Sequence, residues 1–141
     1  MSDEFGSDFT IPNWEESEEG AKLKLVPDGT YQLRFTRWGT SIAGPEAKNA
    51  GRTMLAFNVF VIDPPADGTN YDRDIAIWTF PGDRTFHQFC RAFGLKGTGR
   101  MDEAAIGNLL AGGIGQVTEA RVYTEKPKEG SPHRAKNRVR F

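Results

Sequence analysis

The sequence is poor in the side chains that build disulfides and metal sites. It contains one cysteine, Cys90, and two histidines, His87 and His133, among 141 residues. A single cysteine cannot form an internal disulfide, and these three residues provide no cluster with metal-ligand spacing. We therefore expect neither a disulfide framework nor a structural zinc site, and the sequence implies no cofactor.

Long apolar runs and catalytic motifs are missing as well. No apolar stretch reaches the roughly 18 residues of a membrane-spanning helix, and no basic segment followed by an apolar one marks a signal peptide. The sequence has no serine elbow, no histidine pair and no complete phosphate-binding loop. These absences predict a non-enzymatic protein that resides in the cytoplasm and does not associate with membranes.

Charge is distributed unevenly along the chain. Residues 1–19 contain seven acidic side chains and no Lys or Arg, which leaves 18 basic and 12 acidic residues in the remainder. Residues 1–20 also carry scattered aromatics without a hydrophobic period, so we expect a flexible acidic arm followed by one domain over residues 21–141. The arm is either a solubilising end or a peptide that docks on a partner or on the protein's own basic surface.

The run RTMLAFNVFVID at residues 52–63 gives the strongest strand signal. Its aromatic and β-branched residues suit a pleated surface, and glycine and proline bound it. Alternate residues of a strand face opposite sides, so Leu55, Phe57, Val59 and Val61 form a core row. The second row is also largely apolar, which indicates a surface that is covered or used; its members are Met54, Ala56, Asn58, Phe60 and Ile62.

A period of two predicts four further strands, at residues 30–38, 71–80, 115–124 and 137–141. In the first of these, Tyr31, Leu33 and Phe35 face the core and Trp38 faces outward. Turn-rich residues between the strands predict two long loops, over residues 39–51 and 125–136.

Two helices are predicted between the third and fourth of the five strands. The first covers residues 84–93, capped by Asp83, and shows an apolar stripe at helical spacing. Cys90 lies on that stripe, so we interpret it as a small core residue rather than a nucleophile. A second helix covers residues 102–110 and is broken by the Ala-Gly-Gly triplet that follows.

This order predicts a mainly β protein, a five-stranded OB-fold barrel with a helical insert between strands 3 and 4. Such barrels bind ligands on the face of strands 2 and 3, flanked by two loops. An open barrel leaves strand edges that can pair, so monomer and dimer both remain open.

Aromatic and basic side chains are predicted to gather on that face. Aromatic rings stack on bases with little sequence preference, and cations neutralise phosphates. The pattern therefore predicts a single-stranded DNA-binding protein, with RNA as a possible second ligand. The candidate residues are Arg34, Trp38, Lys48, Asn58, Phe60, Arg73, Trp78, Arg121, Tyr123, Lys126, Lys128, Arg134, Lys136, Arg138 and Arg140.

Other interpretations remain open at this level. The outward aromatics can be covered by the second helix or by the arm, and the loop cations can simply be solvated. The apolar row of residues 52–63 also fits a protein-binding adaptor. Four acids can chelate Mg²⁺, but turn contexts explain two of them without a metal; the four are Asp63, Asp67, Asp72 and Asp74.

The chain also resembles a known family from residue 26 onward, without the acidic arm. The segments that carry the resemblance are PDGTYQLRF, GRTMLAFNVFVID, FHQFCRAFGL, GQVTEARVY and NRVRF. They resemble phage-encoded OB-type proteins long catalogued as a domain of unknown function. The resemblance implies single-stranded DNA binding in phage replication and recombination, in the host cytoplasm. A replication or recombination protein is expected as a candidate partner of the acidic arm, which lies outside the resemblance. The alternative to DNA binding on the same barrel is a protein-binding adaptor or phage accessory protein.

Overall fold

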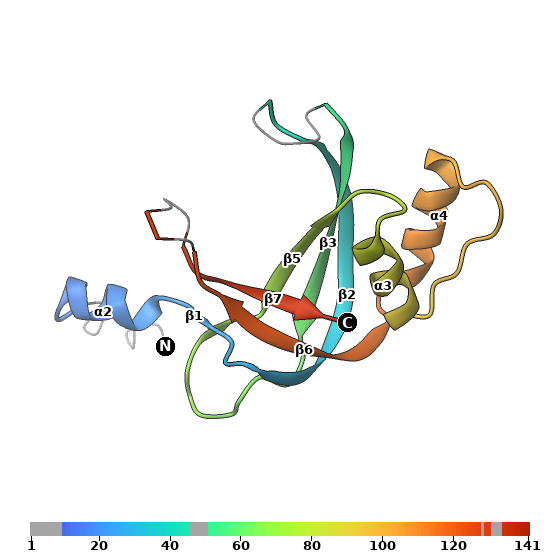
Figure 1. The fold of residues 1–141 in the computed structure, drawn as a ribbon. Coiled ribbons are helices and arrows are strands. Elements are labelled where there is room, and N and C mark those ends of the chain that lie inside the picture. Colours follow the sequence, from blue (N-terminus) through green and yellow to red (C-terminus); the bar gives the residue numbers. More distant parts are fainter. Residues whose placement is uncertain (1–9, 46–50, 128, 131–133) are drawn as a thin grey trace, which may run out of the picture.

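The computed structural model describes residues 10–45, 51–127, 129–130 and 134–141, and its main feature is a five-stranded antiparallel sheet (Figure 1). The strand order is β5-β3-β2-β6-β7. A second, parallel pair joins β1 to β4. The strands are β1 (Lys24–Leu25), β2 (Gly29–Ile42), β3 (Thr53–Val61), β4 (Tyr71–Asp72), β5 (Asp74–Thr79), β6 (Val117–Glu125) and β7 (Lys136–Arg140).

The five predicted strands are confirmed, with two changes. β2 continues to Ile42, although the sequence assigned everything after Trp38 to a loop. Its small polar residues give no alternation signal, but Ser41 and Ile42 pair with the start of β3. The predicted third strand divides at Arg73 into β4 and β5.

The core lies on one face of this sheet and is closed by α3 (Arg84–Ala92). Phe35 and Phe57 are fully buried, as predicted. The ring of Phe89, from α3, stacks on Phe57 at a centroid distance of 4.1 Å and meets Phe35 edge-on at 4.9 Å. Cys90 is buried beside them, and burial raises the pKa of its thiol to about 11. The predicted apolar stripe of this helix is therefore confirmed as core.

The second predicted helix, α4 (Glu103–Gly113), is longer than expected. The Ala-Gly-Gly triplet that was predicted to break it is helical. A Cβ at Gly113 would lie 2.7 Å from Leu95 Cδ1, so glycine permits a close approach here rather than ending the helix. Asp102 caps α4 by accepting the Ala105 N–H, whereas Asp83 makes no side-chain cap bond to α3, contrary to expectation.

The arm contains a helix, α2 (Trp14–Ala21), where the sequence indicated no periodic structure. Asn13 Oδ1 accepts the Glu16 N–H at 2.9 Å, and Trp14 Nε1 donates to Glu18 at 2.9 Å. Local capping and a contact four residues apart thus define this helix, and neither produces an apolar stripe.

The sheet is curved, and its two end strands approach each other. β5 and β7 lie at opposite ends of the strand order and contact one another, but no ladder of hydrogen bonds joins them among the residues described. The fold is therefore mainly β, with helices covering its core face. Within the same residues, no helix has the length and apolarity needed to cross a membrane.

Candidate nucleic-acid interface

A bulge at Thr36 decides which side chains of β2 reach the outer face of the sheet. Phe35 pairs with Val59 but Arg37 pairs with Asn58, so two residues of β2 face one of β3. The Thr36 hydroxyl donates to the Asn58 carbonyl at 3.0 Å. Side chains along a strand alternate with a period of two. One extra residue in β2 therefore reverses the face of the sheet on which each later side chain of β2 lies.

Trp38 consequently lies on the core side, which corrects its predicted outward position. It pairs with Phe57, and a Cβ at Gly107 of α4 would lie 3.5 Å from its ring. Arg37 occupies the outer face instead, and sequence reasoning missed it. A signal existed: strict alternation buries Arg37 and exposes Trp38, against the preference of both side chains.

Phe60 lies on the outer face as predicted, but Arg73 covers its ring. The guanidinium carbon of Arg73 is 4.5 Å from the ring centroid. Arg73 Nε and Nη2 also donate to the carbonyls of Val61 and Ile62, both at 2.7 Å. These bonds hold the junction between β4 and β5 against the end of β3. Phe60 and Arg73 are thus engaged with each other and with the backbone.

Asn58 is also bound within the protein. Its Nδ2 donates to Asp74 Oδ1 at 3.2 Å, and Arg37 Nη2 lies 3.4 Å from Asp74 Oδ2. Both charged groups are largely exposed, so the pair contributes little to stability. The carboxylate of Asp74 reduces the positive potential at this end of the face.

The structure brings four other predicted residues together where β5 approaches β7. We call this group the seam cluster: Trp78, Tyr123, Arg138 and Arg140. The first three line a cavity of about 230 Å³ between the strands, and the Arg140 guanidinium lies 5.5 Å from the centre of the Tyr123 ring. Trp78 is 49% exposed, so the cluster presents an accessible indole beside two cations.

One acid lies within this cavity. Glu125 accepts a hydrogen bond from Arg138 Nε at 2.7 Å, and both side chains are partly exposed. The bond holds the Arg138 guanidinium in place beside the cavity, while part of its charge is neutralised.

The remaining predicted cations lie outside the seam cluster. Arg34 and Arg121 project from the outer face of the sheet, since they pair with Phe60 and Arg140. Three further predicted cations are exposed near the hairpin of β6 and β7: Lys126, Arg134 and Lys136. Lys48 and Lys128 lie outside the described residues.

The four acids considered for a metal have protein partners instead. Asp67 accepts the Tyr71 hydroxyl at 2.6 Å, a bond that lowers the pKa of this carboxyl, and Asp63 accepts the Gln32 N–H. Asp72 accepts the Asp74 N–H. The described part of the chain contains no group of three or more His, Cys, Asp or Glu arranged to hold a metal.

A family model described as "Protein of unknown function (DUF669)" matches residues 13–132, which is most of the chain. The chain belongs to this family. The match starts at the N-cap of α2 and so includes the helical part of the arm, whereas the resemblance recognised in the sequence begins only at residue 26. No curated protein and no solved structure matches the chain. The family is uncharacterised, so membership assigns no activity.

Proposed function

We propose that this protein is a non-enzymatic, OB-type single-stranded DNA-binding protein that coats DNA during phage replication or recombination. The observation that carries the proposal is the seam cluster, in which side chains from β5, β6 and β7 combine an exposed indole with two cations. The strand order supports the OB assignment. The long strand β2 lies between β3 and β6, and the end strands β5 and β7 approach each other.

The chemistry of the cluster suits a flexible, charged strand. A base stacks on the exposed face of Trp78, and stacking of this kind contributes about 1–3 kcal/mol per base. Arg140 and Arg121, which pair across β6 and β7, lie where they can neutralise successive phosphates. Neither interaction reads base edges, so the protein binds with little sequence preference.

Fluorescence anisotropy tests this proposal with labelled oligo-dT, the matched RNA and a duplex at two salt concentrations. We expect single strands to bind more tightly than duplex, and the affinity to fall steeply with salt. Equal binding of duplex and single strand would refute the proposal. Failure of all three to bind would favour a protein-binding adaptor, whose apolar contacts respond little to salt.

A further inference from the structure

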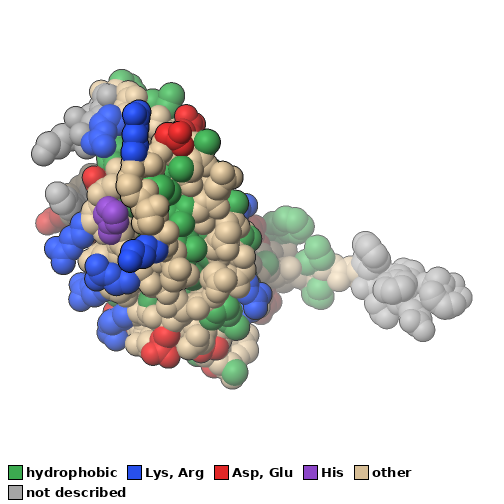
Figure 2. Space-filling view, turned by 90° about the vertical axis from the view of Figure 1, so that its right-hand side faces the viewer, with side chains coloured by type: hydrophobic (Ala, Val, Ile, Leu, Met, Phe, Trp, Pro, Cys, Tyr) green, Lys and Arg blue, Asp and Glu red, His purple; other side chains and the backbone are tan. Residues whose placement is uncertain are grey.

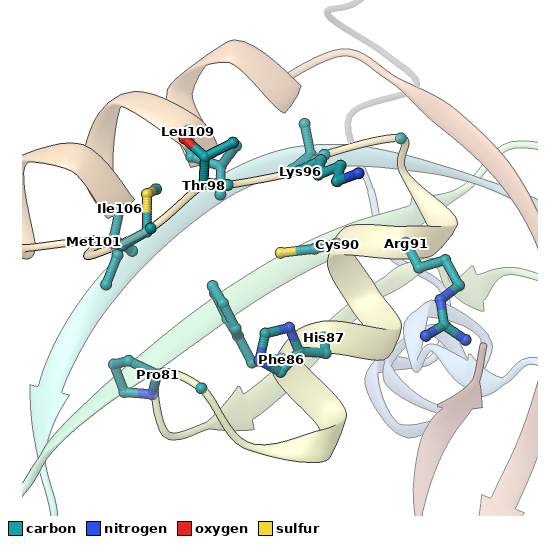
Figure 3. Close-up of a pocket in the computed structure, with 15 residues that line it drawn as sticks. Pro81, Phe86, His87, Cys90, Arg91, Lys96, Thr98, Met101, Ile106 and Leu109 are labelled. Atoms are coloured by element: carbon teal, nitrogen blue, oxygen red, sulfur yellow. The ribbon is translucent and has the colours of Figure 1, made fainter.

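A second cavity, larger than the one at the seam cluster, lies between α3, α4 and the loop that joins them. Its volume is about 890 Å³, within the range of pockets that enclose ligands. Figure 3 shows Phe86 and Cys90 of α3 on one side and Ile106 and Leu109 of α4 on the other. We call this cavity the α3–α4 hollow. Its floor is apolar, so its ligand has an apolar group to bury.

The charged side chains that line the hollow are basic. Arg91 and Lys96 lie along its edge beside His87, and no Asp or Glu is among its lining residues. Figure 2 shows the same face of the molecule, with Lys and Arg side chains around the histidine and apolar side chains beside them. The hollow therefore fits a ligand that carries an apolar anchor flanked by carboxylates.

The acidic arm has this chemistry and leaves its apolar side chains in solvent. Trp14 of α2 is 63% exposed, and Ile11, just before the helix, is 54% exposed. Glu15, Glu16 and Glu18 are exposed around Trp14. An indole surrounded by carboxylates is complementary to an apolar hollow edged by cations.

We infer that the α3–α4 hollow binds the described part of the arm with the rest of α2, Thr10–Ala21, of a second copy of this chain. Figure 1 places α2 on the opposite side of the sheet from α3 and α4, and pairing of β1 with β4 holds the arm at its base. No residue of α2 lines the hollow of its own chain. Because the arm and the hollow lie on opposite sides of one copy (Figure 1), the contact between copies is heterologous, so it builds a chain or a ring of molecules rather than a symmetric dimer.

One single and one double variant test the inference without nucleic acid, so its failure is distinguishable from failure of DNA binding. Trp14→Ala removes the anchor and leaves the hollow intact. Arg91→Glu with Lys96→Glu reverses the charge at the edge of the hollow and leaves the arm intact. Sedimentation velocity on the full chain at low salt should show concentration-dependent association of the wild type. Either variant should weaken that association by about thirtyfold, the loss typical of a truncated tryptophan anchor.

Mixing the two variants gives the decisive result. Each alone should sediment as a monomer, and an equimolar mixture should form a dimer that grows no further, because it has one working arm and one working hollow. Lys126→Glu with Lys136→Glu is the matched charge control and should associate like the wild type. A wild type that stays monomeric at its highest soluble concentration, or a mixture that stays monomeric, would overturn the inference. Unchanged melting temperatures establish that both variants fold.

Discussion

At the scale of single residues, the two tryptophans of the sheet differ in what surrounds them. Trp78 lies on the outer face and is half exposed beside Tyr123 and Arg138. Trp38 packs against the core beneath α4. A tryptophan side chain is therefore a candidate stacking platform at position 78 and a packing residue at position 38.

Replacing each tryptophan with alanine separates these roles. Trp78→Ala should weaken oligo-dT binding by about 1–3 kcal/mol, the value of one stacked base, with little change in melting temperature. Trp38→Ala should instead lower the free energy of unfolding by about 2 kcal/mol or more, because it leaves a cavity under α4. Anisotropy and urea unfolding measure the two effects. A large drop in stability for Trp78→Ala would contradict its placement.

The thiol of Cys90 should be unreactive in the native protein. Burial raises its pKa to about 11, so little thiolate exists at neutral pH. A rise of the pKa from 9.0 to about 11 lowers the thiolate fraction about a hundredfold. A chromogenic disulfide reagent should therefore react slowly with the native chain and rapidly after unfolding in urea. Rapid reaction of the native protein would contradict the buried position.

At the scale of elements, a single side chain of β7 links this last strand to the segment that precedes β2. Asn137 is buried, and its amide bonds both backbone groups of Val26, each at 2.9 Å. Val26 lies between β1 and β2, so this contact joins the end of the chain to its beginning. It also positions β7, which carries Arg138 and Arg140 of the seam cluster.

Asn137→Ala should therefore destabilise the fold. It leaves a buried N–H and a buried carbonyl without partners, which costs about 2–3 kcal/mol. Asn108→Ala, at an exposed position of α4, is the matched control and should be close to neutral. Urea denaturation measures both, and equal stabilities would mean that water replaces the lost bonds.

At the scale of the whole molecule, charge is separated between an acidic arm and a basic remainder. Arg121 and Arg140 are neighbours on β6 and β7 and are exposed. The arm and the candidate DNA surface carry opposite signs, so both DNA affinity and self-association should depend on salt.

The salt dependence of DNA binding gives a count of the phosphates contacted. Replacing Arg121 or Arg140 with alanine should reduce the slope of log affinity against log salt by about 0.7 for each residue. Lys22→Ala, at the C-cap of α2, should leave the slope unchanged. Anisotropy titrations over a range of salt measure these slopes, and unchanged slopes for both arginines would remove them from the interface.

Sequence alone determined the strands and the core rows, because a period of two reports directly which side chains are buried. Leu33, Phe57 and Val61 were placed correctly by this rule, as was the stripe of α3. It also identified Trp78, Tyr123 and Arg138 as outward residues, although on separate strands.

Only the tertiary structure decided which outward residues are available and which of them meet. The bulge at Thr36 exchanged Trp38 for Arg37, and Arg73 covered Phe60. The approach of β5 to β7 created the seam cluster from distant segments. These outcomes depend on the pairing register and on contacts between strands. Neither produces a periodic pattern of residue types in a single sequence. For the same reason the α3–α4 hollow, formed by packing of two helices and a loop, has no counterpart in the sequence pattern.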